Sequence, residues 1–134
     1  MLVSVDPMTL AAAVAGLLLA VVSLFQIALA LGAPLGYAAW GGQHQGVLPN
    51  RLRIASGVAG MVLYPLIILF VLASAGLIEA DWLPGTGRAA MWVLTGFFTL
   101  GAFLNLVSRS KRERYWGPVI LLIAVSCAII ALGI

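Results

Sequence analysis

Four long apolar runs dominate the chain, and short polar stretches separate them. The runs cover about residues 8–31, 54–76, 89–108 and 116–133, and none of them contains a charged side chain. A helix of about 20 apolar residues spans a hydrocarbon core of about 30 Å, and it satisfies its own backbone hydrogen bonds there. The pattern therefore predicts an all-α integral membrane protein, a bundle of four transmembrane helices in one domain of residues 1–134.

The composition agrees with this prediction and narrows the functional classes. Charged residues make up only 8% of the chain, whereas soluble domains contain about 25%. The formal net charge is +3, but the cations flank the apolar runs, where such residues orient a protein and contact lipid headgroups. We therefore expect membrane lipids as partners, with anionic headgroups among them, and no nucleic acid.

The cations are distributed unequally between the two sides that four spans define. The segments after the first and third runs hold six of them: Arg51, Arg53, Arg109, Lys111, Arg112 and Arg114. The opposite side holds only Arg88, together with three acids. Because cytoplasmic loops are enriched in Lys and Arg, the first and third loops are predicted to be cytoplasmic and both termini periplasmic or extracellular.

The segment 32–53 joins the first two runs and is predicted to be a long, glycine-rich cytoplasmic loop. Loops of more than about 12–15 residues are uncommon and are often functional or disordered. Apolar and aromatic residues within it argue against disorder, and Tyr37 and Trp40 are expected to anchor it at the inner membrane interface. The loop either folds over the cytoplasmic mouth of the bundle as part of a binding site or serves as a structural connector.

Three further polar residues of this loop are candidates for binding. Arg51 and Arg53 can hold a phosphate or an acidic lipid headgroup, or they can act only as determinants of orientation. His44 is the only histidine, and a metal or haem site needs several ligands that are not found beside it. His44 is thus interpreted as a solvated loop residue or, alternatively, as a ligand-binding one, and we expect no metal and no cofactor.

Two amide side chains, Gln26 and Asn105, fall near the predicted cytoplasmic ends of their runs. Together with Tyr64 they can line a small polar pocket below the loop. Alternatively they bond between helices, which contributes only about 0.6 kcal/mol on average. No acid or base lies inside a run, which argues against a proton-coupled carrier. Pro65, in the middle of the second run, lacks a backbone N–H and predicts a local bend.

Glu113 is the only acid on the predicted cytoplasmic side, and it stands among four cations. It can tie the third loop to the first by pairing with Arg109 or with an arginine of the first loop; the alternative is a catalytic carboxylate. Arg114, next to it, is a further candidate for ligand binding. Cys127 is interpreted as a small buried residue of the fourth run, too far from His44 to form a catalytic pair.

Several strings in the chain carry a resemblance. GAPLG followed by GG, then LPNRLRI and later SKRERYWGPV, look like a group of small, uncharacterised bacterial integral membrane proteins with four spans. The resemblance covers most of the chain after the first run and implies a multi-pass protein of the bacterial inner membrane. It implies no substrate.

Three functional classes follow from these observations, in order of preference. The first is a non-catalytic module that binds a lipid, a small ligand or a protein partner at the cytoplasmic loop. The second is a small oligomeric transporter or channel without membrane-embedded acids, and the third is a membrane enzyme with chemistry at His44 or Glu113. Stripes of small residues along several runs allow helices of different chains to approach closely, so we also expect a homo-oligomer.

Overall fold

The computed structural model describes residues 5–133, which form helices and loops without a strand. Four helices in this range are long and apolar enough to cross a membrane: Pro7–Ala30, Asn50–Ser74, Arg88–Leu106 and Lys111–Leu132. The predicted all-α chain with four helices of membrane-spanning length is confirmed, as expected of a multi-pass membrane protein.

The first helix, α1 (Pro7–Ala30), begins where the residue types predict it, because Asp is a common N-cap and Pro is favoured at the first helical position, and Asp6-Pro7 directly precedes the first apolar run. Asp6 is its N-cap, and the side-chain carboxylate accepts a hydrogen bond of 2.6 Å from the backbone N–H of Thr9. This bond lowers the pKa of Asp6 below its ordinary value, because it stabilises the charged carboxylate. At the other end Gly32 has a φ of +99°, a conformation that glycine adopts readily and that turns the chain out of the helix.

The second long helix consists of α2 (Asn50–Val58), η3 (Ala59–Leu63) and α3 (Tyr64–Ser74). It begins four residues before the predicted start at residue 54, so Arg51 and Arg53 lie in its first turns rather than in the loop. Pro49, with a φ of −63°, is its N-cap. The helix begins before the apolar run does, because polar residues in the first turns of a helix can remain exposed to water. The loop between the first two helices is correspondingly shorter than predicted.

The segment η3 is a π-helical turn that ends two residues before Pro65. Tyr64 donates its backbone N–H to the carbonyl oxygen of Ala59, five residues earlier. Pro65 has no N–H to donate, and its ring would clash with a carbonyl in a regular α-helical turn, so the wider turn accommodates it. The irregularity that the sequence predicts at Pro65 therefore takes the form of a π turn.

The third and fourth long helices form the second hairpin. Helix α4 (Arg88–Leu106) ends two residues before the predicted boundary, and α6 (Trp116–Leu132) follows closely the predicted fourth run. Between them the charged string RSKRER includes one helical turn, α5 (Lys111–Arg114), with Ser110 as its N-cap. Gly117 permits the tight approach of α6 to Leu106 at the end of α4, because a Cβ at Gly117 would collide with that leucine side chain.

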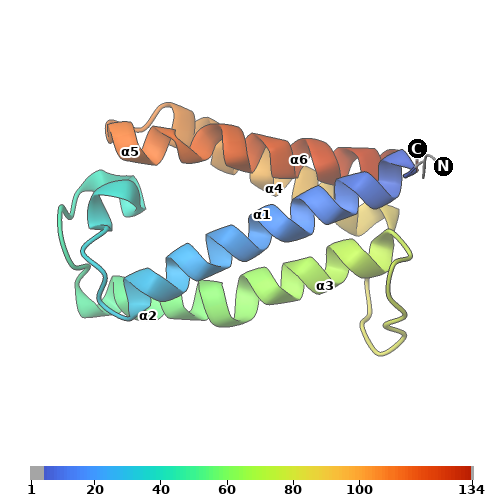
Figure 1. Cartoon of the computed structure of the whole chain (residues 1–134), viewed down its shortest axis with the longest axis horizontal. Coiled ribbons are helices and arrows are strands. Elements are labelled where there is room, and N and C mark those ends of the chain that lie inside the picture. Colours follow the sequence, from blue (N-terminus) through green and yellow to red (C-terminus); the bar gives the residue numbers. More distant parts are fainter. Residues whose placement is uncertain (1–4, 134) are drawn as a thin grey trace.

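The two hairpins pack against each other mainly through α1, which contacts α6 as well as α2, η3 and α3 (Figure 1). Apolar side chains from all four long helices, such as Leu19, Val71, Phe98 and Ile123, form the main core. Toward the left of Figure 1 the α1–α2 pair and the α4–α6 pair diverge, and the segment after α1 lies between them. This end of the bundle is called the loop end below.

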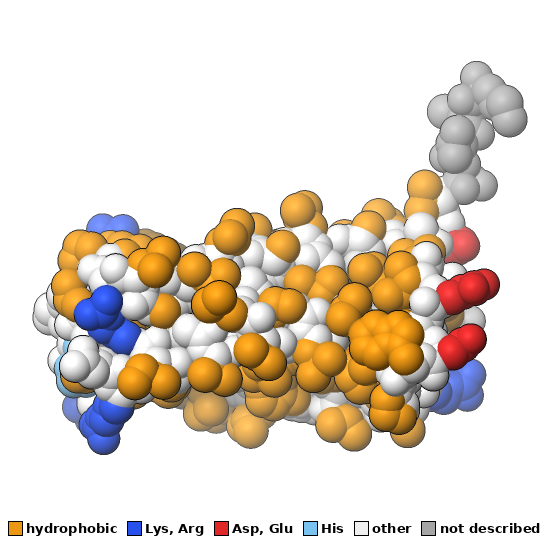
Figure 2. Space-filling view, turned by 90° about the horizontal axis from the view of Figure 1, so that it is seen from below, with side chains coloured by type: hydrophobic (Ala, Val, Ile, Leu, Met, Phe, Trp, Pro, Cys, Tyr) orange, Lys and Arg blue, Asp and Glu red, His pale blue; other side chains and the backbone are white. Residues whose placement is uncertain are grey.

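The outer surface of the bundle is apolar along its length, with charge at the two ends. Figure 2 shows hydrophobic side chains over the visible face, cations at the loop end, and both acids and positive charge at the opposite end. Large apolar side chains such as Leu17 (69% exposed) and Val93 (70% exposed) face outward. An exposed apolar surface of this extent suits contact with lipid and not with water.

Candidate functional site

The loop after α1 is folded into two short 3₁₀ turns, η1 (Gly36–Ala38) and η2 (Trp40–Gly42). Gly36 donates its N–H to the carbonyl oxygen of Gly46 over 2.9 Å. A Cβ at Gly36 would collide with the backbone of His44 and Gly46, so the loop closes on itself tightly here. A small cluster of buried residues then fixes it to the bundle: Leu29, Ala39 and Leu48.

Glu113 connects this loop to the second hairpin. Its Oε2 accepts a hydrogen bond of 2.7 Å from the backbone N–H of Gly41, and the residue is only 9% exposed. Next to it, Ser110 Oγ donates to the carbonyl oxygen of Tyr37 and accepts the backbone N–H of Glu113. The predicted tie between the first and third loops is thus present, but the bond described for the Glu113 carboxylate is to backbone and not to an arginine.

The geometry of the loop explains why the Glu113 carboxylate bonds to a backbone N–H. Gly41 has a φ of +78°, which directs its N–H at the carboxylate and leaves that donor without a helical partner. The Gly41 N–H therefore has the Glu113 carboxylate as its acceptor, whereas Arg109 and Arg114 are exposed and can be hydrated. Sequence alone does not reveal such a backbone partner.

Trp40 connects the loop to the first hairpin. Its indole Nε1 donates a hydrogen bond of 3.0 Å to Ser56 Oγ in α2, where Ser56 is fully buried. Its φ of +51° is uncommon for a residue with a side chain and costs about 1–3 kcal/mol. The loop therefore spans the divergent hairpins, with Trp40 bound to one and Gly41 bound to the other.

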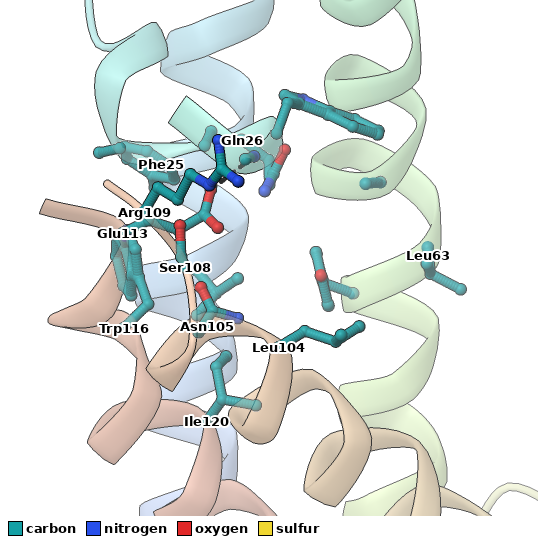
Figure 3. A pocket seen from close by; sticks show the side chains of 17 residues that line it. Phe25, Gln26, Leu63, Leu104, Asn105, Ser108, Arg109, Glu113, Trp116 and Ile120 are labelled. Atoms are coloured by element: carbon teal, nitrogen blue, oxygen red, sulfur yellow. Dashed lines mark hydrogen bonds between the residues drawn. The ribbon is translucent and has the colours of Figure 1, made fainter. Parts of the chain in front are cut away.

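Below this loop lies a cavity of about 700 Å³, called the bundle cavity (Figure 3). The lining residues come from all four long helices, from the loop after α1, and from α5 with the segment before it. Five of the ten predicted binding residues are among them: Gln26, Trp40, Tyr64, Asn105 and Glu113. The two amides that the sequence places near the same ends of their helices thus contribute to one cavity.

The amide groups of the cavity have unused hydrogen-bonding capacity. Asn105 Nδ2 donates to the carbonyl oxygen of Gly101 over 2.7 Å, which uses one of its two N–H groups. Gln26 Oε1 is buried and has no hydrogen-bond partner, and the same is true of Ser23 Oγ one turn earlier on α1. Buried acceptors without partners are rare and call for an explanation.

The walls of the cavity are mainly apolar. Phe25 and Trp116 pack with their ring centroids 4.8 Å apart, and Val22 and Ile120 line the side nearer the core. Leu104, labelled in Figure 3, extends from α4 toward the second long helix. Arg109, Ser108 and Glu113 supply polar groups at the loop end (Figure 3).

The other five predicted residues do not line the bundle cavity. Arg53 Nε donates 3.1 Å to the carbonyl oxygen of Ala30 and so caps the end of α1. Tyr37 lies under the guanidinium of Arg112, whose Cζ is 5.8 Å from the ring centroid. His44 is half-buried in the loop, and Arg51 and Arg114 are exposed.

The lining residues that were not predicted as binding residues from the sequence include Phe25, Trp116 and Arg109. Phe25 and Trp116 are aromatic residues at the depth of Gln26 and Asn105, and that shared depth is the signal that points to them. Arg109 was considered only as a determinant of orientation and as a partner for Glu113. Its position directly after Ser108, at the end of the helix that carries Asn105, brings it to the cavity.

Within residues 5–133, no three His, Cys, Asp or Glu side chains are close enough together to hold a metal ion. Comparison with protein-family models, with curated proteins and with solved structures found no match. The inference of function therefore rests on the geometry of the site.

Proposed function

We propose that the protein is a non-catalytic membrane protein that binds an amphipathic small molecule, of the class of membrane lipids, in the bundle cavity. The observation that carries this proposal is the cavity itself. Its volume of about 700 Å³ lies within the range of about 300–1,000 Å³ typical of ligand pockets. Apolar walls with a few polar groups gathered at one end match a molecule with an apolar body and a polar head.

The unpartnered acceptors on α1 support a ligand with a hydrogen-bond donor. Gln26 lines the cavity, and its buried Oε1 has no hydrogen-bond partner within the described protein. A buried acceptor without a partner costs about 1–3 kcal/mol. A bound hydroxyl or amide group would offset this cost, which favours a polar group of the ligand at the level of Gln26 and Asn105.

The position of the cavity mouth supports entry from the bilayer. Leu63 of η3 is 41% exposed and Leu104 of α4 is 56% exposed, although both line the cavity. The side between these two helices therefore opens onto the apolar surface of the bundle. A lipid can enter there without crossing water.

A closed inner end favours binding over conduction. Beyond Val22 and Ile120 the bundle is filled by core residues such as Leu19, Phe98 and Ile123, of which the most exposed, Phe98, is only 2% exposed. Packed cores of this kind leave no space for a chain of water molecules. The described part of the bundle thus resembles a binding pocket more than a channel.

The wider setting is part of the same proposal. We place the protein in the bacterial inner membrane, with the loop end in the cytoplasm and both termini on the other side, because the cations gather at the loop end. The resemblance to small four-span bacterial membrane proteins supports that location. Assembly into a homo-oligomer would cover part of the exposed apolar surface.

Native mass spectrometry of the protein purified in a mild detergent tests the binding proposal. The wild type should retain a small molecule with a defined mass. Gln26→Leu and Asn105→Leu should each reduce the retained fraction about fivefold, because each removes a hydrogen bond worth about 1 kcal/mol. Thr99→Val, on an exposed face of α4 outside the cavity, is the matched control and should retain it. The proposal would be refuted if the wild type retained no small molecule, or if all variants retained it equally.

A further inference from the structure

A second cavity, called the cationic cavity, lies beside the first at the loop end. Its volume is about 690 Å³. The residues that line it come from the first loop and from the segment around α5: Tyr37, Gly41, Gly42, Gln45, Arg109, Ser110, Lys111 and Arg112. Three of these are cations and none is an acid, so the cavity favours an anion.

Neighbouring contacts fix Arg112 and the segment around α5 beside this cavity. The Arg112 guanidinium lies over the ring of Tyr37, 5.8 Å from its centroid, which orients it toward the loop. Ser110 bonds to the Tyr37 carbonyl oxygen, so the α5 segment and η1 are fixed together. The Cβ of Ser110 also lies where a side chain at Gly42 would be, and the φ of +72° at Gly42 suits glycine.

The two cavities are adjacent, because Arg109 and Gly41 line both of them. Glu113 is the one acid nearby, and its carboxylate lines the bundle cavity, where it accepts the Gly41 N–H. It is mostly buried and does not line the cationic cavity. An apolar space with amide groups is thus joined at Arg109 to a space lined by positive charge.

We propose that the ligand is a phosphate-bearing lipid whose phosphate lies in the cationic cavity, between Arg109 and Arg112, and whose apolar part occupies the bundle cavity. This inference rests on the proposed function and names the class of its ligand. Guanidinium groups bind phosphate oxygens in a bidentate manner and keep their charge at any physiological pH. Lys111 adds a third positive charge at the same site. Inorganic phosphate shares this head chemistry but has nothing to occupy the apolar space.

Lipid binding measured by native mass spectrometry with defined additions tests the inference. The probes are phosphatidylglycerol, a diacylglycerol with the same acyl chains, and inorganic phosphate. The variant is Arg109→Gln/Arg112→Gln. Its control is Arg51→Gln/Arg114→Gln, which removes the same charge from exposed residues at the loop end that line neither cavity. Thermal unfolding of each variant in detergent verifies that it is folded.

The inference predicts that wild-type protein binds phosphatidylglycerol at least about tenfold more tightly than diacylglycerol. The Arg109/Arg112 variant should lose this difference and the control variant should keep it. Equal binding of the two lipids by the wild type would overturn the phosphate assignment while the proposed function stands. An equal loss in the control variant would also overturn it, because general attraction at the loop end would then be the cause.

Two further outcomes separate the remaining possibilities. Binding of inorganic phosphate that depends on Arg109 and Arg112, and that phosphatidylglycerol does not displace, would overturn the lipid assignment in favour of free phosphate. Failure of both lipids to bind the wild type would remove the proposed function and this inference together.

Discussion

At the residue scale, Gly60 lies where the second long helix packs tightly against α1. A Cβ at this position would lie 2.7 Å from the carbonyl oxygen of Ser23 and 2.9 Å from Ile27 Cγ1. Backbone atoms cannot yield as a flexible side chain does, so Gly60→Ala should force α1 and η3 apart. We expect a loss of about 1–3 kcal/mol in the free energy of unfolding, measured by denaturation in detergent.

Gly96→Ala is the matched control for this substitution. Gly96 lies in α4, where an added Cβ has no heavy atom within 4 Å, and alanine is the better helix former. Its stability should equal or exceed that of the wild type. Equal stability of Gly60→Ala and Gly96→Ala would contradict the close packing of α1 on η3.

Residue types in the sequence predicted part of the site. Gln26, Tyr64 and Asn105 are rare polar groups in apolar runs. Burying a polar group without a partner costs free energy, so such residues can be recognised in the sequence as candidates for a site. Glu113 was recognised for a different reason, because it is the only acid among the cations of the predicted third loop. The Gly41 backbone and the Trp40–Ser56 bond could not be predicted, because they depend on how the loop folds in space.

At the scale of elements, the loop after α1 is held to the second hairpin through Glu113. A hydrogen bond to a charged group contributes about 1.5–3 kcal/mol. Glu113→Ala should therefore release η2, and hydrogen exchange of the Gly41 amide should accelerate at least about tenfold. Glu113→Gln keeps an acceptor and should show a much smaller effect.

Glu79→Ala controls for the loss of a carboxylate, because Glu79 is exposed and lies at the opposite end of the bundle. It should leave exchange at Gly41 unchanged. Unaltered exchange in Glu113→Ala would show that the loop does not depend on this bond.

The ends of the elements were predictable where a local signal marks them. Asp6 and Pro7 predicted the start of α1 within one residue, because capping acts within one helical turn. The start of α2 at Asn50 was missed, since apolar runs report where hydrocarbon begins and not where helices begin. Pro65 predicted an irregularity, but a proline can be accommodated by a kink or by a π turn, and the residue type alone does not distinguish the two.

At the scale of the whole molecule, charge separates the two ends of the bundle, and the proposal places the loop end in the cytoplasm. A maleimide that cannot cross membranes tests this in a Cys127→Ala background. Gln43→Cys, exposed in the loop, should be labelled only after cells are opened. Glu79→Cys, exposed at the opposite end, should be labelled in cells whose outer membrane alone is permeable. The reverse pattern would invert the proposed orientation.

The four-helix chain was predictable because each helix needs only its own apolar residues to be stable in lipid. The divergence of the hairpins at the loop end was not, since it arises from contacts between segments far apart in the sequence, such as Gly41 with Glu113. That divergence creates the bundle cavity. The site is thus a property of the folded chain, although several of its residues could be predicted from the sequence.

The central claim is that a lipid occupies the bundle cavity, and photo-crosslinking measures this most directly. Protein in membranes is irradiated with a lipid that carries a diazirine in its acyl chain, and the adducts are mapped by mass spectrometry. We predict that adducts concentrate on Phe25, Trp116 and Ile120, which line the cavity and are not among the exposed residues of the outer surface. Adducts of equal frequency on Leu17 and Val93, which are exposed on the outer surface, would contradict the claim.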